Sequence, residues 1–196
     1  MTPKPEKRAL RQELLARRRA LSADAAESMA EALTARIASL SAYCSARRIL
    51  AYLALPGEAN LDGLIRRALA EGKEVYVPVC LPHFAMEAGR LLDMEHFTAG
   101  PYGLRDLPPG YAAAAPEAMD LVLVPAVACD EEGRRLGHGA GYYDRYLPRV
   151  AREKRLAVLW DFQIVPLVPS DAHDQRMGGF VTEKRVRLIS GKGVKQ

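Results

Sequence analysis

The stretch that decides the fold reads Asp120-Leu-Val-Leu-Val-Pro125-Ala-Val-Ala-Cys-Asp130-Glu-Glu-Gly133-Arg-Arg-Leu-Gly137-His-Gly139-Ala-Gly141-Tyr-Tyr-Asp144-Arg-Tyr-Leu147. Its apolar start predicts a buried strand, and a helical pattern opens after the last glycine. Glycines at every second position let the backbone approach an anion closely, so that successive N–H groups can converge on phosphate oxygens. The helix N-terminus behind them would add partial positive charge, and Arg134 or Arg135 full charge. The stretch therefore predicts a phosphate-binding loop.

The usual nucleotide-binding motifs fit this loop poorly. No Gly-Lys-Ser/Thr follows the glycines, so a Walker A loop would lack its lysine and its magnesium-binding hydroxyl. The gap of roughly twelve residues after the strand does not suit a dinucleotide fingerprint either. By itself the glycine spacing is also compatible with a tight turn, but the flanking Arg-Arg-Leu and Tyr-Tyr-Asp-Arg favour phosphate binding.

Short apolar segments alternate with helical patterns along the rest of the chain. Apolar spacing predicts a first helix over 6–20 and a second helix that begins after the N-cap Ser22. A third helix is predicted over 61–71, where Gly72 ends it. Strands are predicted over 49–53, 75–78, 121–124 and 156–160, with an edge strand within 179–189. The segment 100–116 is rich in Pro, Gly and Ala without periodicity, which predicts a long surface connection.

This order of elements predicts the fold class. Strands that are apolar on both sides and separated by helices indicate a mainly parallel sheet covered by helices. We expect a single three-layer, Rossmann-like α/β domain over residues 1–190, with 191–196 as a disordered tail.

Composition limits the class of protein. A chain of 196 residues that is 49% hydrophobic and 27% charged can bury a sizeable core. It has neither an apolar run of roughly eighteen residues nor a signal peptide, which predicts a soluble, cytoplasmic protein without a membrane partner. Three distant cysteines without a C-x-x-C pair argue against a disulfide framework or a zinc knuckle.

Positive charge is concentrated at the N-terminus. Residues 1–20 carry a net charge of +5 and the whole chain +4, so that residues 21–196 sum to −1. A local excess of this kind indicates an anion site or a solvated helix face, and speaks against a broad nucleic-acid surface.

The glycine-rich stretch also carries a family resemblance. The block Arg135-Leu-Gly-His-Gly-Ala-Gly-Tyr-Tyr-Asp144, after a strand that ends in Val-Pro, resembles the signature of the 5-formyltetrahydrofolate cyclo-ligases, also called methenyltetrahydrofolate synthetases. Three further parts are similar to that family in order and spacing: Lys7-Arg8-Ala9-Leu10-Arg11, Tyr52 to Glu58, and Gln163 to Pro169 with His173-Asp174 and Thr182-Glu183. Together these parts span residues 7–183.

The chain departs from the family pattern at several positions. The family usually has Gly at Ala126, an aromatic residue at Cys129, Tyr or Arg at His138, Gly or Lys at Ala140, and often Asp at Gly178. The first two resemble packing exchanges. His138 and Ala140 lie inside the predicted phosphate loop, so they change the contacts expected there.

The resemblance implies an ATP- and Mg²⁺-dependent enzyme that converts 5-formyltetrahydrofolate to 5,10-methenyltetrahydrofolate and releases ADP and phosphate. ATP would phosphorylate the formyl oxygen, the folate N10 would attack the activated carbon, and phosphate would depart. The protein would contribute mainly positioning and charge neutralisation. Its partners would be a reduced folate and ATP, with no nucleic acid, and we expect a monomer.

The motifs also imply roles for individual residues. ATP would bind the N-terminal basic motif and the glycine-rich block, through Lys7, Arg8, Arg11, Arg135, Leu136, Gly137, His138, Gly139, Ala140, Gly141, Tyr142 and Tyr143. The catalytic residues would be Arg135 and Tyr143. The folate pocket would comprise Leu53, Glu58, His138 and Tyr143, with Glu58 accepting pterin N–H groups. Mg²⁺, which prefers hard oxygen ligands, would bind Asp144 and Asp174.

Several alternatives stay open at this point. Asp144 is also the kind of residue that the dipole of a first helical turn favours. Cys129 could be a nucleophile, although a lone cysteine at an apolar strand end is usually core. His138 could transfer protons instead of lining the pocket. At the level of function, the alternatives are a catalytically inactive nucleotide- or RNA-binding member of the fold, and an ATP-dependent ligase acting on another pterin-like substrate.

Overall fold

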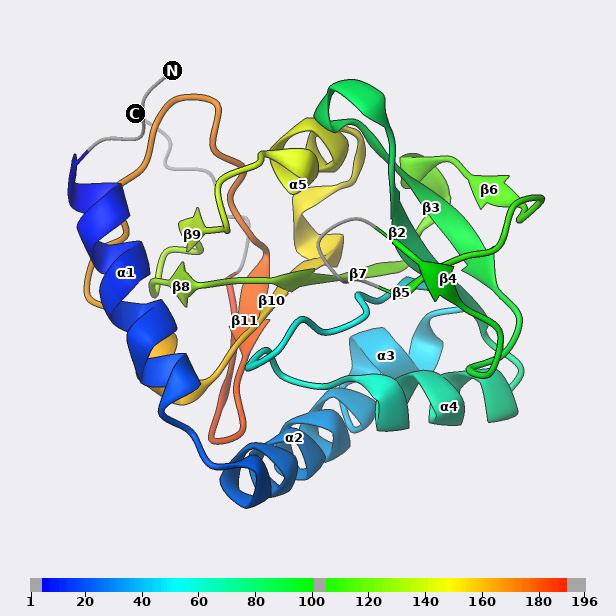
Figure 1. Cartoon of the computed structure of the whole chain (residues 1–196), viewed down its shortest axis with the longest axis horizontal. Helices are drawn as coiled ribbons and strands as arrows, with labels where there is room; N and C mark the ends of the chain where they lie inside the picture. Colours follow the sequence, from blue (N-terminus) through cyan, green and yellow to red (C-terminus); the bar gives the residue numbers. More distant parts are fainter. Residues whose placement is uncertain (1–4, 101–104, 190–196) are drawn as a thin grey trace.

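The computed structural model describes residues 5–100 and 105–189, so the predicted tail over 191–196 lies outside the described residues. An eight-stranded sheet forms its centre, in the order β12-β11-β10-β7-β1-β2-β3-β6 (Figure 1). Its strands are β1 (Arg48–Leu50), β2 (Glu74–Cys80), β3 (Met86–Leu91), β6 (Ala113–Ala114), β7 (Leu121–Pro125), β10 (Arg155–Val158), β11 (Gly179–Val181) and β12 (Val186–Leu188). The inner strands pair in parallel and β3, β6 and β12 pair antiparallel, which confirms the mainly parallel sheet.

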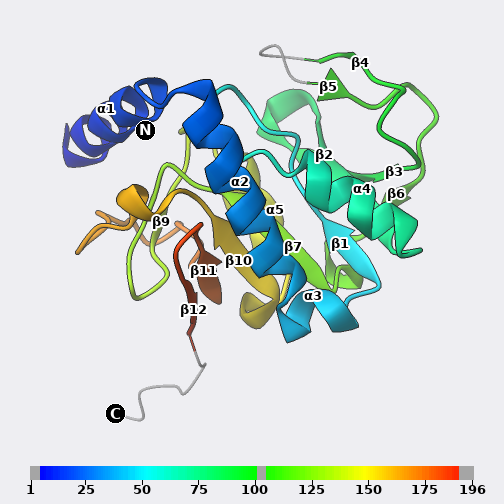
Figure 2. The same ribbon diagram turned by 90° about the horizontal axis from the view of Figure 1, so that it is seen from below.

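Helices cover both faces of this sheet. The helices α2 (Ala23–Ala38), α3 (Ser41–Ser45) and α4 (Asp62–Ala70) lie on one face, in front of the sheet in Figure 2. On the other face lie α5 (Tyr142–Tyr146) and the 3-10 turn η4 (Leu147–Arg149). Each face has its own apolar cluster, so the sheet is buried on both sides and the predicted three-layer arrangement is confirmed.

Local sequence explains where the helices begin and end. Ser22 caps α2 as predicted, because its hydroxyl accepts a hydrogen bond from the Ala25 amide at 3.3 Å. After α4, Gly72 adopts a φ of 76°, the left-handed conformation that ends helices. Further short 3-10 turns are η1 (Pro82–Phe84), η3 (Pro116–Ala118), η5 (Arg152–Lys154) and η6 (Asp161–Gln163).

Several regions differ from the sequence-based predictions, and neither β3 nor α3 was predicted. The paired parts of β1 and β10 end three and two residues earlier than predicted, because the chain leaves the sheet there to form loops. Between Pro125 and Gly137 the expected loop contains a hairpin of β8 (Ala128–Cys129) and β9 (Arg135–Leu136). The presumed plain connection over 100–116 contributes β6 and also β5 (Arg105–Asp106), which pairs with β4 (Thr98–Ala99).

The order of the strands creates a crevice at one edge of the sheet. From β1 the chain passes through α4 to β2 on one side, and it later returns to β7 on the other side of β1. At such a switch point the loops that leave the carboxyl ends of neighbouring parallel strands diverge and open a binding crevice. The loop over 51–61 and the glycine loop over 137–141 are therefore brought to the same edge.

Helix α1 (Pro5–Arg19) lies across this edge and covers neither face of the sheet. It runs beside β8 and β9 in Figure 1 and packs there through a small apolar cluster of Leu14, Val127, Ala128, Leu136 and Val168. Its basic side chains are thereby held against the loops that follow the strands. Among residues 5–100 and 105–189, no helix combines the length and apolarity needed to cross a membrane.

Leu14 is expected to be the main anchor of α1, because its side chain is only 1% exposed. Leu14→Ala should lower the free energy of unfolding by about 2–5 kcal/mol, through lost burial and the cavity left behind. The matched control is Leu92→Ala at a side chain that is 79% exposed, which should change stability by less than about 0.5 kcal/mol. Urea unfolding of both variants measures this, and equal effects would contradict the anchoring role.

Candidate functional site

The inner face of α1 brings two of its predicted basic residues into the site. Lys7 is 8% exposed, and its ammonium donates hydrogen bonds to Asp171 at 2.7 Å and to Asp174 at 2.5 Å. Burial alone would lower the pKa of Lys7, but the two carboxylates outweigh it and raise that pKa. Arg11, one helical turn further on, donates to the Gly137 carbonyl oxygen at 2.9 Å. Arg8 is exposed on another side of the helix, and no hydrogen bond or ion pair joins it to the described residues of this site.

The glycine loop has the backbone freedom that its sequence predicts. Gly139 and Gly141 have φ values of 113° and 76°, which other residues rarely adopt. A Cβ at Gly137 would lie 2.8 Å from Nη1 of Arg135, so a side chain there would shift the guanidinium of Arg135. The helix behind the loop, however, has only five residues before it tightens into η4. The expected contribution of a helix dipole is therefore small, and most positive charge must come from side chains.

Of the two candidate arginines, Arg135 is the one that pairs with the predicted metal ligand Asp144. It is buried, and its Nη2 donates to Asp144 Oδ1 at 3.0 Å, while Nη1 donates to the Pro125 carbonyl oxygen at 3.2 Å. Arg134 lines the same pocket as Arg135, Asp171 and Asp174, but its guanidinium pairs with Asp130, the buried carboxylate that closes the turn of the β8–β9 hairpin.

Carboxylates gather beside these basic groups. Asp171, His173 and Asp174 have potential ligand atoms within 4.8 Å of one another. The next residue, Gln175, donates its amide N–H to Asp144 Oδ1 at 3.4 Å, which links the two predicted metal ligands. The oxygen-rich set suits Mg²⁺ chemically. Sequence reasoning missed Asp171, although its spacing of three residues from Asp174 in one loop was an available signal.

Glu58 contacts the glycine loop through His138. Its side chain is 6% exposed, its Oε2 accepts the Leu55 amide at 3.0 Å, and its Oε1 lies 2.9 Å from Nε2 of His138. His138 thus connects the glycine loop to Glu58. Leu53, the other predicted pocket residue from this loop, is buried in the apolar cluster under α2 and α4.

Tyr143 connects the two halves of the site. Its ring lies 5.7 Å from the guanidinium carbon of Arg135. Burial raises the pKa of Tyr143, and among the described residues its enclosed hydroxyl has no hydrogen-bond partner. A buried hydroxyl without a partner is costly, so this group suits a ligand that would satisfy it.

Cys129 does not fit the role of a nucleophile. The side chain is fully buried in the apolar cluster beneath α5, and burial raises the pKa of its thiol to about 12. The nucleophilic form of cysteine is the thiolate, which such a thiol does not populate near neutral pH. Cys129 is therefore a core residue.

The three thiols are expected to react at very different rates with a chromogenic disulfide reagent at pH 8. Cys44 is exposed and should react in the fast phase, whereas Cys129 should react only after unfolding in urea, because its thiol stays protonated and enclosed. Cys44→Ala should remove the fast phase, and Cys129→Ala should leave it intact. Rapid loss of a thiol in native Cys44→Ala that is absent from the Cys44→Ala/Cys129→Ala protein would contradict this assignment.

Comparison with known proteins gives consistent matches over nearly the whole chain. The model of the 5-formyltetrahydrofolate cyclo-ligase family matches residues 3–183. A protein of Mycolicibacterium smegmatis named 5-formyltetrahydrofolate cyclo-ligase is 34% identical over 194 residues, covering 94% of this chain and 97% of that protein. A Mus musculus protein of the same name is 30% identical over 189 residues, covering 90% and 93%.

Solved structures agree with these matches. The NMR structure of Aquifex aeolicus 5,10-methenyltetrahydrofolate synthetase superposes with a TM-score of 0.84 at 32% identity, covering 97% of this chain and 96% of that one. A 5,10-methenyltetrahydrofolate synthetase from Mycoplasma pneumoniae gives a TM-score of 0.74 at 20% identity, covering 91% and 99%, and supports the fold alone. The chain therefore belongs to the 5-formyltetrahydrofolate cyclo-ligase family, as its glycine-rich block predicted, and is an enzyme of that family.

Proposed function

We propose that this enzyme cyclises 5-formyltetrahydrofolate to 5,10-methenyltetrahydrofolate, using ATP and Mg²⁺ and releasing ADP and phosphate. One observation carries the proposal beyond the family name. Two acid–base pairs, Lys7 with Asp174 and Arg135 with Asp144, lie around the glycine loop. Each pair joins a cation that suits a phosphate to a carboxylate that suits a metal ion.

The phosphates of ATP would enter between these pairs. Lys7 and Arg11 would approach them from α1, and Arg135 with the backbone of residues 137–141 from the other side. Because Lys7 and Arg135 are already held by carboxylates, the bound phosphates would replace an existing partner of each cation. This exchange would leave the Asp144 and Asp174 oxygens available to Mg²⁺, which would neutralise charge on the phosphate oxygens when bound.

The folate would bind on the Glu58 side of the glycine loop. The Glu58 carboxylate can accept hydrogen bonds from the N–H groups of a pterin, and the enclosed Tyr143 hydroxyl can donate to a ligand oxygen. His138 contacts Glu58 from the glycine loop, so the folate and the phosphates would meet at this loop. That proximity is what transfer of a phosphoryl group to a formyl oxygen requires.

The chemistry needs no protein nucleophile. The formyl oxygen would attack the γ-phosphorus of ATP and ADP would leave, which turns the formyl oxygen into a phosphate leaving group. The folate N10 would then attack the formyl carbon, and departure of phosphate with loss of the N10 proton would give the methenyl bridge. Arg135 would stabilise charge on the transferred group, and Tyr143 would orient the reacting oxygen.

A binding-only role has less support from the geometry. Among the basic residues of α1, Lys7, Arg11 and Arg18 turn inward to protein partners, so they do not form a basic stripe for nucleic acid. A different pterin-like substrate would use the same contacts, and only turnover separates it from the proposed one.

Purified protein should convert 5-formyltetrahydrofolate to methenyltetrahydrofolate only when ATP and Mg²⁺ are both present, as measured by near-ultraviolet absorbance. Arg135→Ala and Asp144→Ala should each lower kcat/KM by at least about 100-fold, because they remove charge at the transferred phosphoryl group and at the metal. Arg67→Ala, at an exposed position of α4, is the matched control and should stay within about twofold of the wild type.

Failure of the wild-type protein to turn over, despite binding ATP, would refute the proposed substrate. If the wild-type protein turned over and Arg135→Ala and Asp144→Ala were as active as it is, the proposed substrate would be retained. The assignment of the phosphate and metal residues would then be wrong.

Glu58→Gln is expected to separate folate recognition from nucleotide recognition. The amide keeps the size of the side chain but loses the charge that strengthens hydrogen bonds from pterin N–H groups, so the KM for the folate should rise by roughly 10- to 100-fold. The KM for ATP should change by less than about twofold, because Glu58 lies across the glycine loop from the phosphates. Initial rates with each substrate varied in turn measure both constants, and an equal rise in both would contradict the role of Glu58.

A further inference from the structure

Both the backbone and the side chain of Glu58 form hydrogen bonds within its own loop. Leu55 and Glu58 close a turn, in which the Glu58 amide donates to the Leu55 carbonyl oxygen at 2.9 Å and Gly57 has a φ of 80°. The Leu55 amide in turn donates to Oε2 of Glu58 at 3.0 Å. One carboxylate oxygen is therefore committed to the loop, and Oε1 is the oxygen directed toward the site.

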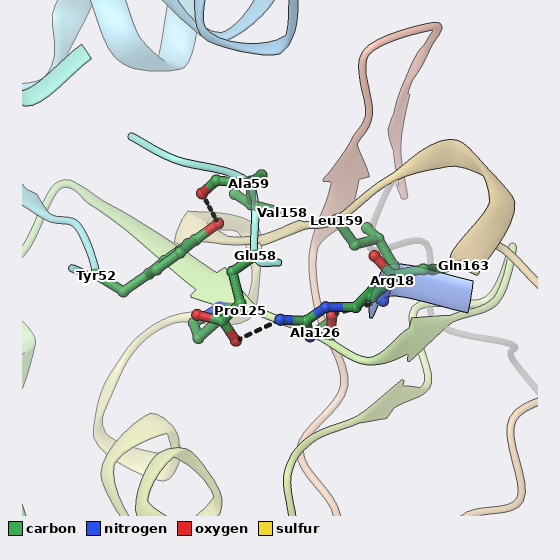
Figure 3. Close-up of a pocket in the computed structure, with 9 residues that line it drawn as sticks. All are labelled: Arg18, Tyr52, Glu58, Ala59, Pro125, Ala126, Val158, Leu159 and Gln163. Carbon is green, nitrogen blue, oxygen red and sulfur yellow. Dashed lines mark hydrogen bonds and ion pairs between the residues drawn. The ribbon is translucent and has the colours of Figure 1, made fainter. Parts of the chain in front are cut away.

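Arg18, near the end of α1, holds this turn from the side opposite His138. Its Nε donates to the Gly57 carbonyl oxygen at 3.1 Å, and its Nη2 lies 3.7 Å from Oε1 of Glu58. Figure 3 shows the guanidinium directed at the carboxylate along the wall of a narrow cavity. Trp160 donates to the same Gly57 oxygen at 3.0 Å, so the turn is fastened both to α1 and to the segment after β10.

The ion pair between Arg18 and Glu58 is buried, so loss of one partner affects the other strongly. Arg18 is 4% exposed and the Glu58 side chain 6% exposed, so neither charge is stabilised by bulk water. A buried carboxylate that loses the cation paired with it is strongly destabilised in its position. The other neighbour of Oε1, His138, is 41% exposed and is not permanently charged, so it is a weaker substitute.

We propose that Arg18 is a positioning residue for folate recognition, which holds the Glu58 carboxylate in the orientation in which Oε1 can accept a hydrogen bond from a donor of the folate ring. This inference rests on the proposed function, because it deepens the role given there to Glu58. It also gives α1 a second task. The same helix that would bind phosphates through Lys7 and Arg11 would set the folate-binding carboxylate through Arg18, so one rigid element would serve both substrates.

A purely structural role for Arg18 would give a different pattern of effects. Loss of a buried arginine could loosen α1 as a whole, and Lys7 and Arg11 would then be displaced together with Glu58. A structural effect therefore changes ATP and folate binding alike, and does so whatever residue stands at position 58. An effect that acts through Glu58 changes folate binding alone and disappears when the carboxylate is absent.

A double-mutant cycle on the full-length protein tests this. Arg18→Leu is expected to raise the folate dissociation constant by about tenfold or more while leaving that of ATP within about twofold. In the Glu58→Gln background, Arg18→Leu should change the folate constant by less than about twofold. Arg18→Lys, which keeps the charge but loses the bond from Nε, should recover part of the wild-type affinity. Arg19→Leu, at the exposed neighbouring position, is the matched control and should bind as the wild type does.

The outcomes distinguish the two hypotheses. An increase of the same factor in both backgrounds, or equal losses of ATP and folate affinity, would overturn the positioning role and leave the proposed function intact. If the wild-type protein neither bound nor converted the folate, both would fall. If Arg18→Leu did not fold, Arg18→Gln would decide, because wild-type folate affinity without a cation at this position would overturn the positioning role.

Discussion

The ion pair between Lys7 and Asp174 joins segments that lie 167 positions apart in the chain. It connects the first described helix to the loop that precedes β11, across the carboxyl edge of the sheet. The apolar contact around Leu14 holds the middle of α1 against the β8–β9 hairpin, and Lys7, Arg11 and Arg18 then form contacts along one side of the helix. The contacts of Lys7, Arg11 and Arg18 therefore depend on the docked helix, whereas the Arg135–Asp144 pair forms without it.

Charge balance explains how such a polar site can be built without its ligands. Lys7 is shared by Asp171 and Asp174, Arg135 is paired with Asp144, and Glu58 lies between Arg18 and His138. Buried charges are tolerated when they are paired and hydrogen-bonded, so the cations and carboxylates stabilise one another in this state. Phosphates and a metal ion would exchange partners with these groups, so that each cation and each carboxylate would again have a partner of opposite charge.

The sequence predicted the features that depend on local pattern. It did not predict contacts between segments that are distant in the chain. The strands around Val77 and Leu123, the cap at Ser22 and the glycine loop follow from neighbours within a few positions. The pairing of Lys7 with Asp171 and of Arg18 with Glu58 depends on how α1 crosses the sheet, which no local pattern specifies. The β8–β9 hairpin was missed because two-residue strands are too short to produce a period, and its turn is held by the buried Asp130.

The short helix α5 bears on the departures of this chain from its family. With five helical residues behind the glycines, the loop cannot rely on a helix dipole and depends on Arg11 and Arg135 for positive charge. Ala140 is exposed and contributes only its carbonyl oxygen to Arg145, so a small side chain there leaves those two cations in place. The histidine at position 138 changes the contacts of the site more than Ala140 does, because its imidazole reaches from the glycine loop to Oε1 of Glu58. In the proposed mode of binding, a folate that takes up Oε1 would share or displace this contact, so the glycine loop would take part in recognising both substrates.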